Sequence, residues 1–457
     1  TESEARRLIA DLRAVLGPHA LIGMDQEGGS VSRAVFLPQA PAAMALGAAG
    51  DESLAEDVGA AVARGLRSIG VNWNFAPVLD VNNNPDNPVV AERSFGADPH
   101  AVARLGAAWT RGALSEGVAC CVKHFPGHGD TQVDSHHALP TVEKSLAELD
   151  TLELVPFRGV ASPALMTAHI VYPRIDAEYP ATLSRRLLTG VLRERLGYDG
   201  VVITDALMMK AVYEHYGHAR SAVLALQAGV DMVLAQGTRD EQRATVLAIT
   251  QALAAEELEP AALLRSTARL DALATRFPSQ PGPYDETRRA ADDKLLREAW
   301  ARGLTAVANP MPPPRSRLRV VTQADVPSDG IAEAGIPAAA VRALFDAFAD
   351  VEFVFVEDLQ RITRAQFPRD GRFNVLVSNH RQRYATAAQR HGLSLPATPL
   401  RPDLHIVLWN PFQVLDIAAP AVVTWGYADG ALAALRAWAE GRASAAGRTP
   451  VPLEPAW

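Results

Sequence analysis

The stretch KHFPGHGDTQVDSHH, residues 123–137, holds four of the chain's 12 histidines and two aspartates. An imidazole has an ordinary pKa of about 6.5, so it can release and recover a proton near neutral pH. A neighbouring carboxylate can orient the ring and stabilise its charged form, and Asp134 and His136 supply such a pair two residues apart. The stretch therefore indicates acid/base chemistry, although a solvated polar turn would have the same spacing.

A metal site is the second interpretation of this stretch. His124 and His128 have the four-residue spacing of a helical zinc pair, but Pro126 and Gly127 between them are incompatible with a regular helix. Barrel metallohydrolases usually draw ligands from several strands, and no H-x-H motif follows an early strand here. We therefore expect neither a metal nor a cofactor. A loop-borne metal site stays open as an alternative, with the ligands His128, Asp130, Asp134 and His136.

The elements that must position these residues alternate between short apolar runs and amphipathic helical patterns. Strands that are apolar on both faces and separated by helices predict a parallel sheet covered on both sides, and the repeated units favour a (β/α) barrel of the TIM type. Nothing before residue 20 resembles a strand, so the barrel could lack its first strand here. The predicted strands are 20–25, 71–75, 118–123, 164–168, 201–204 and 230–234, and the clearest helices are 52–69, 99–116, 183–196 and 238–256.

A Pro/Gly-rich break, PSQPGPYDE at 278–286, marks the predicted end of the barrel. We assign 1–277 to the catalytic barrel, 278–305 to a linker and connecting helix, and 306–457 to a second domain. Five further apolar strands separated by helices predict an α/β/α sandwich of flavodoxin-like type. They lie at 318–322, 352–356, 373–378, 405–409 and 421–425.

Composition narrows the class of protein. A net charge of −8 without a lysine/arginine block argues against a nucleic-acid or membrane-surface partner. No apolar run approaches the roughly 18–20 residues that cross a bilayer. Cys120 and Cys121 are adjacent in an apolar run and are expected to be buried, inert thiols. The chain begins without a leader-like segment, which favours the cytoplasm, but a secreted form stays open, because the first residues could be trimmed from a longer protein. We expect a monomer.

Charged residues follow the predicted strands, where a barrel gathers its chemistry. Lys123 and His124 end one strand, and a carboxylate, Asp205, follows the strand 201–204. Asp205 could be a nucleophile or simply cap the next helix, and the residues alone do not separate the two. Asp80 lies in a long loop, where we expect it only to brace the backbone.

Six motifs in order between about residues 20 and 235 resemble glycoside hydrolase family 3, and within it the β-N-acetylhexosaminidase (NagZ-like) branch of peptidoglycan turnover. One departure is Ser30, where the family usually has arginine. The motifs are DQEGG-x-V-x-R, NFAPVLDVNNNP, RSFGAD, KHFPGHGDTQVDSH, MTAHIVYP and VVITDALMM.

The resemblance implies retention of configuration through a covalent glycosyl–aspartate intermediate. By position in the motifs, Asp205 matches the nucleophile, His136 the general acid/base and Asp134 its partner. Other matches are expected to hold the terminal sugar: Asp25, Arg33, Arg93, Lys123, His124 and, in a supportive role, His169.

The implied activity is that of an exo-β-N-acetylglucosaminidase acting on peptidoglycan fragments or related glycans. A neutral imidazole repels an incoming anion less than a carboxylate would, so an N-acetylglucosaminide phosphorylase stays open. A β-glucosidase of the same family and a non-catalytic glycan-binding protein also stay open.

Overall fold

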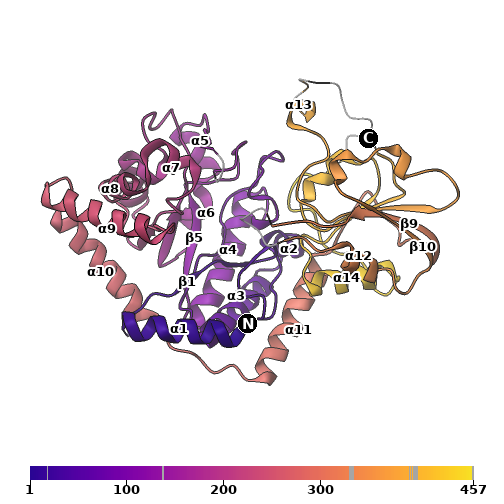
Figure 1. Cartoon of the computed structure of the whole chain (residues 1–457), viewed down its shortest axis with the longest axis horizontal. Coiled ribbons are helices and arrows are strands. Elements are labelled where there is room, and N and C mark those ends of the chain that lie inside the picture. Colours follow the sequence, from indigo (N-terminus) through magenta and orange to yellow (C-terminus); the bar gives the residue numbers. More distant parts are fainter. Residues whose placement is uncertain are drawn as a thin grey trace. The chain divides into compact units, whose positions relative to one another are not determined.

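The computed structural model describes residues 1–17, 19–135, 138–328, 334–390, 392, 394 and 400–454 (Figure 1). The chain forms two compact units. The first unit comprises Thr1–Asp25, Gly59–Val90 and Asp98–Tyr284, and the second comprises Gln26–Val58, Ala91–Ala97 and Asp285–Trp457.

These boundaries differ from the predicted division at 277 and 306, because two early segments pack with the C-terminal part of the chain. Met44 and Ala45 share one apolar core with Trp300 and Val423. The hydrophobic pattern of a segment shows that it buries a face, but not which distant partner covers it.

The first unit is built on a parallel sheet whose strands lie in the order β1-β4-β5-β6-β7. A single bridge from Ile203 to Met232 extends it by the predicted strand at 230–234. The sheet and its intervening helices confirm the predicted barrel class. The strands are β1 (Gly23–Met24), β4 (Trp73–Asn74), β5 (Ala119–Phe125), β6 (Ala164–Thr167) and β7 (Val201–Ile203).

Helices connect these strands, and their ends carry the expected signals. In α4, Pro99 occupies the first turn and the Asp98 side chain accepts a hydrogen bond from the backbone N–H of His100. The 183–196 pattern is a π-helix, η3 (Arg186–Arg195). The remaining helices before residue 285 are α1 (Glu2–Leu16), α2 (Ala43–Ala49), α3 (Glu52–Ile69), η1 (Ala91–Arg93), α4 (Pro99–Ser115), α5 (Leu146–Thr151), α6 (Leu154–Gly159), η2 (Ala181–Leu183), α7 (Lys210–Tyr216), α8 (His218–Ala228), α9 (Arg239–Ala254) and α10 (Pro260–Arg276).

The second unit contains a six-stranded sheet in the order β10-β9-β11-β12-β13-β8. Its first five strands are parallel and follow the 2-1-3-4-5 order of flavodoxin-like folds, as predicted. The sixth, β8, pairs antiparallel to β13 and was not predicted. The strands are β8 (Thr305–Val307), β9 (Ser316–Gln323), β10 (Ala349–Val356), β11 (Phe373–Ser378), β12 (Leu404–Val407) and β13 (Ala421–Val423).

Strand residues of this sheet form the core of the second unit. Val320 and Val377 pack with Trp438 of α14, whereas Val321 and Leu376, which alternate with them, belong to a separate apolar cluster. A short hairpin of β2 (Gln26–Gly28) and β3 (Val31–Ser32) also belongs to this unit. The other helices of the unit are α11 (Glu286–Gly303), α12 (Ala338–Ala343), η4 (Leu359–Arg361), η5 (Arg364–Gln366), α13 (Ala387–Arg390), η6 (Pro411–Asp416) and α14 (Asp429–Ala439). No helix in the described part of the chain is long and apolar enough to cross a membrane.

Candidate active site

Charged residues meet at the carboxyl ends of the parallel strands of the first unit. Lys123, near the end of β5, donates a 2.6 Å hydrogen bond from Nζ to Oδ1 of Asp25, which follows β1. The Lys123 side chain is 2% exposed, whereas that of Asp25 is 35% exposed. The lysine thus stabilises a carboxylate that is still accessible to a ligand.

Asp205 and the Asp25–Lys123 pair all interact electrostatically with the thiol of Cys121. Burial raises the pKa of the Cys121 thiol on β5, the charge of Lys123 opposes that shift, and the carboxylates of Asp25 and Asp205 add to it. One buried thiol therefore interacts with all three charged groups. Cys120 and Cys121 are both buried free thiols, as predicted.

The backbone on both sides of Asp205 is held by the neighbouring 230–234 strand. The Thr204 N–H donates to the carbonyl of Met232 and the Leu207 N–H to that of Leu234. The Asp205 side chain accepts a 2.7 Å hydrogen bond from the next N–H, that of Ala206.

Asp205 does not cap the following helix. The N-cap position of α7 is Met209, which makes no side-chain capping bond. The helix-cap interpretation of this carboxylate is therefore wrong.

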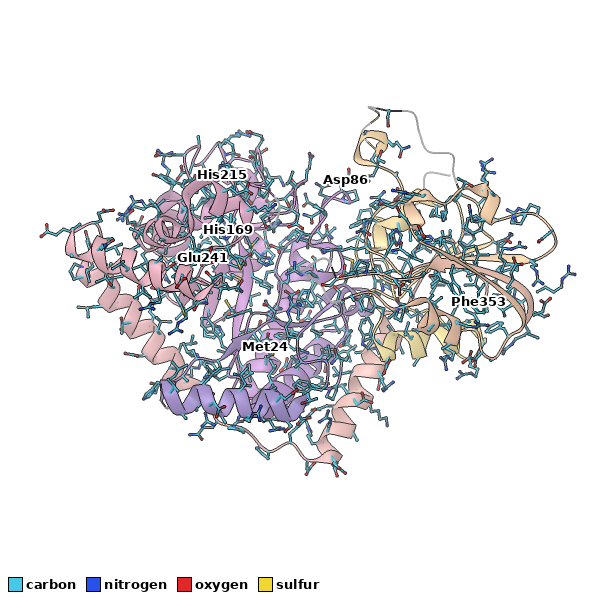
Figure 2. All side chains as sticks on the ribbon, viewed as in Figure 1. Met24, Asp86, His169, His215, Glu241 and Phe353 are labelled. Atoms are coloured by element: carbon cyan, nitrogen blue, oxygen red, sulfur yellow. The ribbon has the colours of Figure 1, made fainter. Side chains whose placement is uncertain are left out.

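His169, which follows β6, is fully buried and labelled in Figure 2. Its Nε2 lies 3.1 Å from the carbonyl of Ala206, which can only accept, so Nε2 carries the proton. Its Nδ1 lies 2.8 Å from the hydroxyl of Thr182. These contacts orient the backbone directly after Asp205, so the described geometry gives His169 a positioning role.

Asp80 anchors the strand end that carries the histidines. Its Oδ1 accepts from the backbone N–H groups of His124, at 3.1 Å, and His128, at 2.7 Å. Its Oδ2 lies 2.7 Å from Nδ1 of His124. Burial opposes ionisation of Asp80, but the two histidines and these donors hold its pKa below the ordinary value.

The role of this aspartate exceeds the one predicted from the sequence. We expected Asp80 only to brace a loop, yet it is fully buried and contacts both His124 and His128. The available signal was its place at the end of the apolar segment NFAPVLD.

His128 is buried and uncharged. Burial lowers its pKa to about 4, although the charge of Asp80 opposes this. Its ring nitrogens contact two hydroxyls, with Nδ1 2.9 Å from Thr131 Oγ1 and Nε2 2.9 Å from Ser135 Oγ. Asp134 lies in the same loop and is 9% exposed. The predicted acid/base residue His136, together with His137, lies outside the described residues.

The start of this loop packs closely against its surroundings. A Cβ added at Gly129 would lie 1.7 Å from the backbone oxygen of Val81, so only glycine fits there. Further along, Lys144 forms ion pairs with Asp130, at 2.7 Å, and Glu153, at 2.5 Å. These contacts hold the start of the loop, at Gly129 and Asp130, and the segment around Lys144.

The two predicted arginines belong to the second unit. Arg93 makes a bidentate ion pair with Glu27, with both N–O distances 2.8 Å and both side chains buried. This contact restrains the guanidinium, and Glu27 is a partner that was not predicted from the sequence. Arg33 is exposed.

Ser30, the departure from the family pattern, contacts a buried carboxylate. Its hydroxyl donates a 2.5 Å hydrogen bond to Oε1 of Glu92, which also accepts from Trp409. Burial raises the pKa of Glu92, while the charge of Arg381 and the Ser30 bond oppose the shift. Ser30 therefore contacts Glu92 through a neutral hydroxyl and forms no ion pair with it.

The metal interpretation gains no support from the residues that are described. Among them, no group of three or more His, Cys, Asp or Glu side chains could hold a metal ion. Two proposed ligands have other partners, since His128 contacts two hydroxyls and Asp130 pairs with Lys144.

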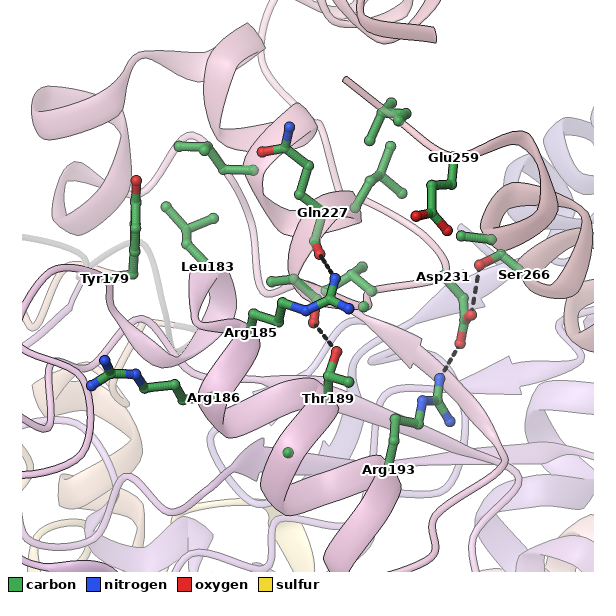
Figure 3. A pocket seen from close by; sticks show the side chains of 18 of the residues that line it. Tyr179, Leu183, Arg185, Arg186, Thr189, Arg193, Gln227, Asp231, Glu259 and Ser266 are labelled. Carbon is green, nitrogen blue, oxygen red and sulfur yellow. Dashed lines mark hydrogen bonds and ion pairs between the residues drawn. The ribbon is translucent and has the colours of Figure 1, made fainter. Parts of the chain in front are cut away.

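A groove of about 980 Å³ lies elsewhere on the first unit, between η3, α8 and α10 (Figure 3). Within it, Asp231 accepts from Arg193, Ser266 and Arg269 and from the Val202 N–H. These contacts attach the outer helices to the sheet. None of the predicted site residues lines the groove, so we do not assign the chemistry to it.

The strand-end arrangement is suited to attack by a carboxylate on an electrophilic carbon. Asp205 is half-buried and rigidly held, and the Asp25–Lys123 pair offers an acceptor for ligand hydroxyls.

Comparisons with known proteins agree with this arrangement. The model of the glycosyl hydrolase family 3 N-terminal domain matches residues 3–273. A beta-hexosaminidase A of Pseudoalteromonas piscicida is 38% identical over 286 residues, which cover 56% of this chain and 47% of that protein. A beta-hexosaminidase of Chromobacterium violaceum is 39% identical over 271 residues, covering 56% of this chain and 75% of that protein. The match therefore spans about half the length of the first relative.

A solved structure resembles the chain over its whole length. The glycoside hydrolase family 3 beta-N-acetylglucosaminidase from a Paenibacillus species has a TM-score of 0.85 and 31% sequence identity. The alignment covers 100% of this chain and 91% of that structure.

Proposed function

Since the chain belongs to glycosyl hydrolase family 3, we propose that it is a retaining exo-β-N-acetylglucosaminidase. Its substrates would be peptidoglycan fragments or related glycans that end in β-linked N-acetylglucosamine. The relatives named beta-hexosaminidase and beta-N-acetylglucosaminidase support N-acetylglucosamine as the sugar. The carboxylate of Asp205 at the strand end supports nucleophilic attack on that sugar.

The observation that carries the proposal is the state of Asp205. It follows a buried strand, its backbone is held on both sides, and it does not cap the next helix. A carboxylate fixed in this way can attack an anomeric carbon without first losing conformational freedom.

The proposed reaction has two steps. Asp205 attacks the anomeric carbon and forms a glycosyl ester, while His136 gives a proton to the departing oxygen. His136 then removes a proton from water, which attacks the same carbon and releases the sugar and the free carboxylate. Asp134 would stabilise the charged imidazole between the steps. The net result is hydrolysis with retention.

The terminal sugar would be held mainly by charged groups. The accessible carboxylate of Asp25, stabilised by Lys123, can accept bonds from hydroxyls. Asp80 orients the ring of His124, which we propose contacts the sugar through Nε2. We also retain Arg33 and Arg93 as candidate contacts to the sugar or its acetamido group.

The test compares aryl β-N-acetylglucosaminide with aryl β-glucoside, using the parent protein, Asp205→Asn and Asp199→Asn. Asp199 precedes β7, at the opposite end of the strand from Asp205, so it controls for loss of a carboxylate. We expect faster cleavage of the N-acetylglucosaminide, abolished only by Asp205→Asn.

Faster cleavage of the glucoside would favour the β-glucosidase, and no turnover by the parent protein would favour a glycan-binding role. Product analysis with and without phosphate separates hydrolysis from phosphorolysis. A sugar phosphate as the main product would replace the hydrolase with a phosphorylase.

A further inference from the structure

Ser135 has two anchors, and it lies in the chain between the two proposed acid/base residues. Its Oγ lies 2.9 Å from Nε2 of His128, just beyond β5. Its carbonyl accepts a 3.3 Å hydrogen bond from the N–H of Ala211 in the first turn of α7. The loop is thus tied to the segment that follows β5 and to the first turn of α7.

His128 is a fixed point for this contact. Asp80 accepts from its backbone N–H at 2.7 Å, and Asn87 donates to its carbonyl at 2.8 Å. Thr131 lies against its other ring nitrogen. These contacts hold both the backbone and the ring of His128. The position of its Nε2 therefore does not depend on the part of the loop that follows Ser135.

The imidazole of His128 acts here as an uncharged hydrogen-bonding group. Its ring is buried, and its lowered pKa of about 4 keeps it neutral at the pH where a histidine acid/base would work. A neutral imidazole has one donor and one acceptor nitrogen, and the hydroxyls of Thr131 and Ser135 can satisfy either arrangement. The Ser135–His128 contact therefore does not require His128 to gain or lose a proton.

We propose that His128 and Ser135 form a positioning pair that fixes the loop backbone between Asp134 and His136 for proton transfer. This inference rests on the proposed function. A general acid must lie within hydrogen-bond reach of the leaving oxygen, and a displacement of about 1 Å can cost about a hundredfold in rate. Neither member of the pair touches the substrate in this scheme, so both act through the loop.

The test uses Ser135→Ala, His128→Ala and His128→Gln, with Ser378→Ala as a matched control. Ser378 Oγ lies 2.7 Å from Nε2 of the buried His405 and 2.6 Å from the hydroxyl of Tyr384, so this substitution removes a serine–histidine contact of the same kind, and one further contact, within the second unit. Each variant is assayed on an alkyl β-N-acetylglucosaminide, whose leaving group must be protonated, and on a dinitrophenyl glycoside, whose leaving group need not be.

We expect Ser135→Ala and His128→Ala to slow the alkyl glycoside about 10- to 100-fold and the dinitrophenyl glycoside less than about threefold. His128→Gln should stay close to the parent, since an amide is also a neutral hydrogen-bonding group. Ser378→Ala should change neither rate. The double variant of His128 and Ser135 should be no slower than either single alanine variant.

Equal losses on both substrates would overturn the proposal, because they would indicate general structural damage. A His128→Gln variant as slow as His128→Ala, with one limb of the pH profile missing, would make His128 a proton carrier instead. Multiplied losses in the double variant would contradict a joint role.

Amide hydrogen exchange gives a readout that does not depend on turnover. Exchange across 129–135 should be faster in Ser135→Ala than in the parent and in Ser378→Ala. Unchanged exchange would refute the pair. If the parent cleaves no N-acetylglucosaminide, the proposed function fails, while the exchange measurement still decides whether the pair holds the loop.

Discussion

Replacing Asp80 with asparagine tests the buried centre of the site, because it changes one oxygen and leaves the shape intact. The amide side chain would keep an oxygen for the two backbone N–H groups of His124 and His128 that Oδ1 now accepts. It would place an NH₂ group where Oδ2 now lies 2.7 Å from Nδ1 of His124. Since an ionised carboxylate only accepts hydrogen bonds, Nδ1 carries a proton in the parent. In the variant Nδ1 must accept, so the ring switches tautomer.

The cost follows from replacing a charge-assisted hydrogen bond with a neutral one. A hydrogen bond to a charged group contributes about 1.5–3 kcal/mol and a neutral one about 0.5–1.5 kcal/mol, so we expect Asp80→Asn to destabilise the protein by about 1 kcal/mol. For a unit of this size the Tm should fall by about 2–4 °C. If Nε2 of His124 contacts the sugar, reversal of its donor or acceptor role should lower kcat/KM about 10- to 100-fold.

Thermal unfolding, steady-state kinetics and the ring-nitrogen NMR signals of His124 provide the three measurements. Asp271→Asn, the same substitution on the exposed face of α10, is the control and should change none of them. A variant with the parent's tautomer and kcat/KM would refute the reasoning, because Asp80 would then not orient His124.

Three further outcomes follow from the structure. Gly129→Ala should destabilise the protein by about 3 kcal/mol, because the added Cβ would meet the backbone oxygen of Val81. Gly190→Ala is the control and should not destabilise it, because a Cβ there has nothing within 4 Å. Equal Tm values for the two variants would contradict this. Lys123→Met should lower kcat/KM about 10- to 100-fold, mainly through KM, by removing the partner of Asp25; unchanged kinetics would remove the pair from the site. The free energy of unfolding should also fall as the pH drops from about 6.5 toward 4. The reason is that certain buried histidines stay neutral in the folded chain but take up protons in the unfolded chain. Each of them costs at most about 2 kcal/mol at pH 5. A flat urea-unfolding profile between about pH 7.5 and 5 would contradict it. The residues concerned are His128, His380 and His405, whose pKa values are lowered by burial to about 4, 4 and 3.

Local patterns were sufficient to predict most of the fold. Apolar runs separated by helical periodicity correctly located the five parallel strands of each sheet along the chain. The strand β8 was missed, because three residues directly after a long helix carry too little pattern. The packing of Gln26–Val58 with the C-terminal part was also missed, since it depends on contacts between segments far apart in the chain.

For the site, residue types and strand ends identified Asp25, Lys123 and Asp205, which the structure brings together. The sequence did not separate a helix cap from a nucleophile at Asp205, because that choice depends on where α7 begins. It also left His128 without a role, since the hydroxyl partners of a buried imidazole depend on the loop's path. The assignments of Asp134 and His136 stay predictions.

The central claim is that Asp205 becomes covalently attached to the sugar. The most direct measurement treats the protein with a fluorinated N-acetylglucosaminide that carries a good leaving group and forms a slowly hydrolysed ester, and then maps the modified peptide by mass spectrometry. We predict one sugar adduct, on Asp205, and none in Asp205→Asn. An adduct on another carboxylate, or turnover of the natural linkage with inversion and no adduct, would contradict the account.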